Sequence, residues 1–118
     1  MSHPLHKVRE AALELPGTEE RLSHGQPTFF VTGKSFAQFR DNHHGDGKTV
    51  VCVRISGPDE QAMLLETAPE TYSKPAYMPS WLSIDLAGED VDWDHVGDRI
   101  AASWELAAPR RLLEAGGR

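Results

Sequence analysis

The sequence has a single cysteine, Cys52, among its 118 residues. No disulfide can form within the chain, which is typical of proteins that fold in a reducing compartment. The first residues lack the apolar core of a secretory signal peptide. No apolar run approaches the roughly 20 residues that a membrane-spanning helix needs. We therefore expect a cytoplasmic protein with no membrane partner.

Positive charge is also in short supply. Twelve Lys and Arg residues stand against 18 Asp and Glu residues, for a formal net charge of −6. Affinity for a phosphate backbone comes largely from Lys and Arg, so this balance argues against a protein that binds nucleic acid with its whole surface. Six acidic residues gather within residues 85–98, whereas the basic residues are scattered. A polarised molecule with a local basic face remains compatible with this distribution.

Linkers, internal repeats and low-complexity segments are missing as well. A chain of this length fits one domain and buries roughly two-thirds of its unfolded surface without the help of a metal or a disulfide. We therefore predict a single domain that spans residues 1–118.

Hydrophobic periodicity predicts an α+β domain, with a mostly antiparallel sheet and the N-terminal and C-terminal helices packed on one of its faces. The predicted helices cover residues 4–15, 58–67, 93–106 and 110–115. The predicted strands cover residues 28–32, 35–40, 49–55 and 81–86. The strand at 49–55 is apolar on both faces, which indicates a central position in the sheet.

The most specific local signal is a tight hairpin within residues 24–40. In a strand, Phe29 and Val31 point to one face, and Phe30 and Thr32 point to the other. Gly33 supplies the positive φ that a short hairpin turn needs, and we expect the turn at Gly33 and Lys34. His24 is interpreted as a residue that fixes the entry to this hairpin.

Several motifs occur in the order seen in MmcQ/YjbR-like proteins, and the resemblance covers nearly the whole chain. The residues that carry it lie at 24–29, 33–37, 75–77, 81–86, 91–93 and 103–112. The resemblance implies a CyaY-like, double-wing arrangement of sheet and helices, in a family whose members are described as DNA-binding proteins. The family has no agreed catalytic residues. One departure is Ser80, which stands where the family often has a glycine before the tryptophan.

Two hypotheses of function follow. The first is a non-enzymatic binding module, with DNA as the partner implied by the resemblance. Its candidate contacts are basic residues of the predicted sheet, joined by an arginine pair near the C-terminus. These residues are Lys34, Arg40, Lys48, Arg54, Arg110 and Arg111.

The alternative is a protein that binds or sequesters a small planar ligand. Tyr72, Tyr77 and Trp81 lie close together in the sequence, and aromatic rings of this kind can line a pocket. His24 is the polar candidate for the same pocket. The oligomeric state is open under either hypothesis.

Residues 41–46 hold the densest group of candidate metal ligands, with two histidines and two aspartates. Adjacent histidines seldom bind one ion without distant partners, so we interpret this segment as a solvated loop and expect no metal site or cofactor. A metal-dependent enzyme is the third reading. Cys52 lies in mid-strand, which disfavours a nucleophilic role.

Overall fold

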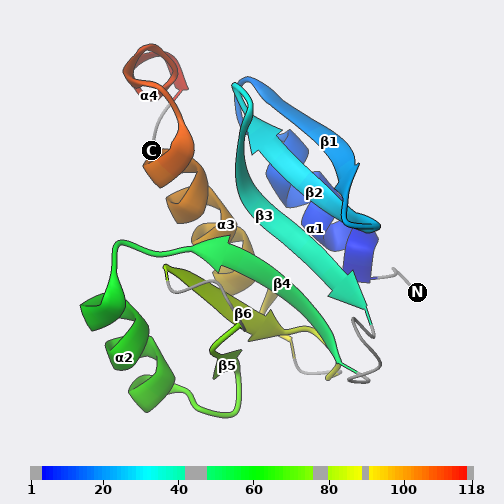
Figure 1. Cartoon of the computed structure of the whole chain (residues 1–118), viewed down its shortest axis with the longest axis vertical. Coiled ribbons are helices and arrows are strands. Elements are labelled where there is room, and N and C mark those ends of the chain that lie inside the picture. The colour runs from blue at the N-terminus through cyan, green and yellow to red at the C-terminus, as the bar shows by residue number, and fades with distance from the viewer. Residues whose placement is uncertain (1–3, 42–47, 76–79, 89–90, 117–118) are drawn as a thin grey trace.

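The computed structural model describes residues 4–41, 48–75, 80–88 and 91–116. These residues form a six-stranded antiparallel sheet in the order β1-β2-β3-β4-β6-β5, with helices packed against it (Figure 1). The strands are β1 (Thr18–Ser23), β2 (Gln26–Val31), β3 (Lys34–Asp41), β4 (Thr49–Arg54), β5 (Tyr72–Ser73) and β6 (Trp81–Asp85). The helices are α1 (Pro4–Leu13), α2 (Pro58–Thr67), α3 (Trp93–Ala107) and α4 (Arg110–Gly116). The predicted α+β class is confirmed, and no described helix is long and apolar enough to cross a membrane.

Two tight turns connect the first three strands. His24 and Gly25 join β1 to β2, with φ values of 53° and 78°. Thr32 and Gly33 join β2 to β3, with φ values of 48° and 81°. Two-residue turns with positive φ at both positions match the twist of antiparallel strands. The predicted turn is thus shifted by one residue, and Lys34 is the first residue of β3.

Strand β1 was missed by the sequence analysis, as was the two-residue strand β5. β1 pairs only with β2, so it is an edge strand, and its alternate residues are exposed. A half-solvated edge needs few apolar residues, and charged side chains there discourage pairing with other molecules. Arg9 of α1 binds Glu20 of β1 through two hydrogen bonds of 2.6 and 3.0 Å. The hydrogen bond from Arg9 lowers the pKa of the Glu20 carboxyl.

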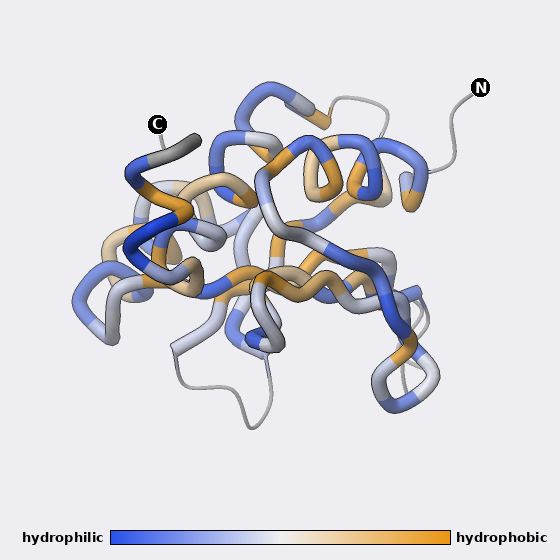
Figure 2. Tube along the Cα trace, turned by 90° about the horizontal axis from the view of Figure 1, so that it is seen from above, coloured by the Kyte–Doolittle hydropathy of each residue, from blue (hydrophilic) through white to orange (hydrophobic). Residues whose placement is uncertain are grey.

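The described helices lie on one side of the sheet. α1 and α3 run behind it in Figure 1, and the sheet is seen edge-on beneath the helix layer in Figure 2. Val96, Ile100 and Trp104 of α3 are buried against the core-facing residues of the strands. α2 belongs to the same side, because Glu60 lies 3.6 Å from Arg99 of α3. The predicted one-sided covering is confirmed for these elements.

A β-bulge in β3 adapts the sheet to α3. Phe29 pairs with Ala37 and Phe30 with Ser35, so Phe36 is an extra residue on β3. Phe36 and Ala37 are both fully buried. The bulge therefore turns two successive side chains into the core, where simple alternation would turn one of them away.

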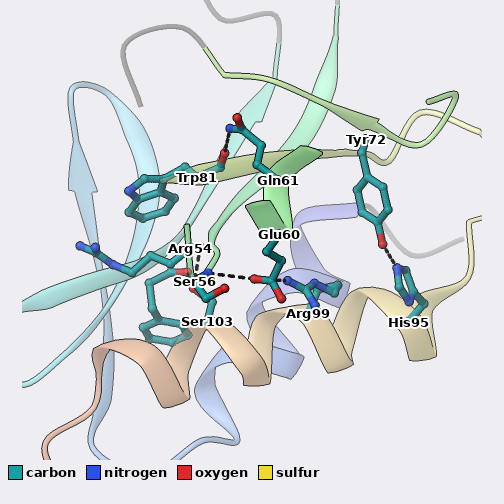
Figure 3. Close-up of polar contacts among 10 residues, drawn as sticks. Arg54, Ser56, Glu60, Gln61, Tyr72, Trp81, His95, Arg99 and Ser103 are labelled. Carbon is teal, nitrogen blue, oxygen red and sulfur yellow. Dashed lines mark hydrogen bonds and ion pairs between the residues drawn. The ribbon is translucent and has the colours of Figure 1, made fainter. Parts of the chain in front are cut away.

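Two side chains near the end of α3 hold the layers together. The Ser103 hydroxyl donates to the carbonyl of Phe36 and accepts a 2.8 Å hydrogen bond from the backbone N–H of Arg54 (Figure 3). It thus joins the bulge of β3 to the end of β4. Trp104 donates its indole N–H to the carbonyl of Pro16 at 3.0 Å, which ties α3 to the connection between α1 and β1.

Replacing Ser103 by alanine should destabilise the fold. Ser103 is fully buried, so its loss leaves the Phe36 carbonyl and the Arg54 N–H without this partner. An unsatisfied buried group costs about 1–3 kcal/mol. We expect the free energy of unfolding of Ser103→Ala, measured by urea denaturation, to fall by roughly that amount. Ser73→Ala, at an exposed position of β5, is the matched control. An equal change in both variants would contradict this role.

Candidate nucleic-acid interface

The sheet face turned away from the helices carries three arginines. Strand register places Arg21 opposite Thr28, Arg40 opposite Val50 and Arg54 opposite Trp81, and paired residues point to the same face. We call this surface the open face. Its residues include Glu19, Arg21, Thr28, Phe30, Ser35, Gln38, Arg40, Val50, Cys52, Arg54, Trp81, Ser83 and Asp85.

Arg54 is held in place from two directions. Its guanidinium carbon lies 4.8 Å from the centroid of the Trp81 ring, in cation–π geometry. Its Nε donates a 2.6 Å hydrogen bond to the carbonyl of Ser35, a residue of the neighbouring strand β3. Partial burial lowers the pKa of Arg54, although a guanidinium stays charged at neutral pH. Figure 3 shows the Arg54 side chain beneath the Trp81 ring.

Arg21 repeats this arrangement at the β1 edge. Its guanidinium carbon lies 4.3 Å from the centroid of the Phe30 ring. Its Nη2 also lies 3.2 Å from a carboxylate oxygen of Glu19, but the Arg21 side chain stays 54% exposed. The open face therefore has a stacked arginine–aromatic pair on β1 and β2 and another on β4 and β6.

A buried polar row lies in the middle of the open face. Gln38 donates to the Thr28 hydroxyl at 3.0 Å and accepts from Arg40 Nε at 2.8 Å. Cys52 Sγ and Ser83 Oγ are 3.4 Å apart. Desolvation raises the pKa of the Cys52 thiol. This row orients Arg40, and burial favours the protonated form of the cysteine although the bond to Ser83 acts in the opposite direction.

Acidic residues concentrate on the helix side. A groove of about 470 Å³ between α1 and α3 is lined by several carboxylates and a single lysine, Lys7. The carboxylates are those of Glu10, Glu14, Asp94 and Asp98. The open face carries two carboxylates, those of Glu19 and Asp85, beside its three arginines. The groove between α1 and α3 is thus more acidic than the open face.

The structure brings together part of the predicted basic set. Arg40 and Arg54 lie on the open face, Lys34 is exposed where β3 begins, and Lys48 is exposed just before β4. Arg110 and Arg111 lie on α4, outside the sheet. Arg110 forms an ion pair of 3.1 Å with Glu114 of the same helix.

The predicted aromatic pocket is not assembled by its described residues. Tyr72 pairs with Ile84 and faces the core, whereas Trp81 lies on the open face. His24 is exposed in the turn between β1 and β2. Tyr77 lies outside the described residues. These positions separate the members of the predicted site.

Tyr72 instead meets His95 of α3, a contact the sequence analysis did not anticipate. The Tyr72 hydroxyl and His95 Nε2 form a hydrogen bond, with the two ring centroids 5.8 Å apart (Figure 3). Both residues line a cleft of about 360 Å³ between β5, β6 and the start of α3. Burial raises the pKa of the Tyr72 phenol.

The predicted loop at residues 41–46 lies mostly outside the described part of the chain. Asp41 is described, and it accepts a 2.9 Å hydrogen bond from the Thr49 hydroxyl. Among the described residues, no group of three or more His, Cys, Asp or Glu side chains is placed to hold a metal ion.

Of the residues in the two arginine–aromatic pairs, Arg21 and Phe30 were not assigned to a site from the sequence. Arg21 was missed because β1 itself was missed. The signal for β1 is the pair His24 and Gly25, which suits a hairpin turn between two strands.

Comparison with protein families matched the family model YjbR over residues 13–106, which is most of the chain. The chain belongs to the YjbR family. The crystal structure of the Deinococcus radiodurans protein DR2400, with a DUF419 domain, superposes with a TM-score of 0.74. The identity is 15%, over 98% of this chain and 91% of that one, so the likeness is one of fold. No curated protein matched this YjbR-family chain.

The thiol of Cys52 should not react in the native protein. It is fully buried and its pKa is raised by desolvation, so thiolate is scarce at pH 8. We expect a colourimetric disulfide reagent to label no cysteine in buffer and one cysteine per chain in denaturant. Rapid labelling of the folded protein would contradict the burial of Cys52, and a Cys52→Ser variant gives the baseline.

Proposed function

We propose that this YjbR-family protein binds nucleic acid through the open face of its sheet, as a binding module without a catalytic step. The observation that carries the proposal is the placement of Arg21, Arg40 and Arg54 on one face, with acidic residues concentrated on the other side. A cytoplasmic location, expected from the single cysteine, would give access to DNA and RNA.

The charge separation answers the objection raised by the net charge of −6. Electrostatic attraction to phosphates is screened beyond about 10 Å at 0.1 M salt, so the local face matters more than the total charge. The carboxylates of the groove belong to α1 and α3, which lie on the other side of the sheet from the open face (Figure 1). The open face can therefore attract a polyanion that the helix side repels.

The arginines are prepared for this task before a ligand arrives. Stacking on Trp81 and the bond to Ser35 fix the Arg54 guanidinium, and Gln38 holds Arg40 Nε. A side chain that is already ordered loses less entropy on binding. Planar guanidinium groups also donate two parallel hydrogen bonds to a phosphate. Lys34 adds an exposed charge at the end of the same sheet.

Removing one cation from the open face should weaken binding more than removing one from the helix side. We compare Arg21→Gln with Lys7→Gln, which changes the net charge equally but lies in the groove between α1 and α3. The measurement is fluorescence anisotropy with labelled DNA between about 50 and 200 mM salt. For Arg21→Gln, we expect the slope of log K against log salt to become shallower by about 1, the value for one lost phosphate contact.

Lys7→Gln should leave that slope unchanged. Absence of salt-sensitive binding by the unmodified protein would disprove the proposal. Equal losses in both variants would show that total charge, and not the open face, determines the affinity.

A second candidate function is binding of a small planar cation in the cleft beside Tyr72. This revises the planar-ligand hypothesis, because the cleft joins an aromatic ring to two carboxylates. Glu70 and Asp92 line it together with Tyr72 and His95. Carboxylates favour a cationic ligand, and rings favour a flat one.

Benzamidine and benzoate form a matched pair of planar probes with opposite charge. We expect benzamidine alone to stabilise the protein in thermal unfolding, by about 2.7 kcal/mol when its free concentration is about 100 times its Kd. Glu70→Gln should reduce the effect, whereas Asp59→Asn on α2 should not. Equal shifts with benzoate would rule out this cleft as a cation site.

A further inference from the structure

We infer that the open face takes single-stranded nucleic acid, with bases stacked on the guanidinium planes of Arg21 and Arg54. This rests on the proposed function and narrows its ligand to unpaired strands. The two arginine–aromatic pairs carry the inference, because contacts to phosphate alone do not require an arginine placed over an aromatic ring.

The two stacks lie in one row across the sheet. Phe30 of β2 pairs with Ser35 of β3, and Arg54 of β4 donates to the Ser35 carbonyl and pairs with Trp81 of β6. Three strand spacings of about 4.8 Å separate β2 from β6, so the rings of Phe30 and Trp81 are roughly 14 Å apart. Ser35 is the residue between the stacks, and its small side chain leaves both guanidinium groups accessible from the same side.

A base can complete each stack. In each pair, the guanidinium carbon lies over an aromatic ring on one side, and the exposed part of the arginine side chain is left for a ligand. Arg21 is 54% exposed, and Arg54 is partly exposed. Proteins stack unpaired bases on both aromatic rings and guanidinium planes, in a manner that tolerates any base.

The spacing favours an unpaired strand over a duplex. Stacked bases in a duplex are 3.4 Å apart along each strand, which is about one quarter of the distance between the rings of Phe30 and Trp81. Two bases that stack on Arg21 and Arg54 must therefore unstack from the adjacent bases of their strand. Paired bases inside a duplex cannot do so without unpairing, whereas a single strand can splay across the sheet.

The test compares a labelled single-stranded DNA 12-mer with the duplex that it forms with its complement, at equal salt. We expect the unmodified protein to bind the single strand at least tenfold more tightly. Arg21→Lys and Arg54→Lys, alone and combined, keep the positive charge but remove the planar guanidinium group. They should weaken single-strand binding by about tenfold per site, and duplex binding by a smaller factor. Arg21→Lys is the variant that leaves the Ser35 bond intact.

A second readout follows the Trp81 ring directly. Single-stranded DNA should change the tryptophan emission of the unmodified protein, with Trp81→Phe supplying the contribution of the other two tryptophans. Equal or tighter duplex binding would overturn this inference and keep the proposed function. An equal loss of affinity for both DNA forms in the lysine variants would also overturn this inference, because the guanidinium group would then not distinguish unpaired from paired bases. Binding to neither form would overturn both proposals.

Discussion

The packing of every described helix on one side of a single sheet is the constraint on which the rest of this structure depends. Because adjacent residues of a strand point to opposite faces, covering one face fixes the character of half the positions. Val51, Val53 and Ile84 are buried beneath α3, while their neighbours face the other way. Those neighbours are free to carry charge. The core and the arginine-bearing surface are thus two consequences of one arrangement.

Arg54 shows how closely the two faces are coupled. Its backbone N–H is bound by Ser103, which comes from the helix layer, while its side chain lies on the open face against Trp81. The position of the guanidinium therefore depends on the docking of α3 on the far side of the sheet. Gln61 of α2 adds to this by donating to the Trp81 carbonyl at 2.9 Å. The surface is supported by the core and is not a loose set of charges.

Much of the fold was accessible from the sequence because its signals are local. The turn near Gly33 and the periodicity of the predicted helices and strands depend on residues within a few positions of one another. β1 escaped prediction because an edge strand needs little apolar surface. The candidate site was only partly accessible, because the pairing of Arg54 with Trp81 depends on a register between strands 27 positions apart. A pocket containing Tyr72 and Trp81 failed for the same reason, since neighbours in sequence ended on opposite faces.

The two consecutive turns described above also bear on the order in which the chain acquires its structure. β1, β2 and β3 pair through two-residue turns, so their contacts close short loops at little entropic cost and form within microseconds. Ser103 and Phe36 are separated by 67 positions, and Trp104 and Pro16 by 88. These long closures are slow. The three-stranded meander is thus available early as a template, and the arrival of α3 is the step that completes the native state.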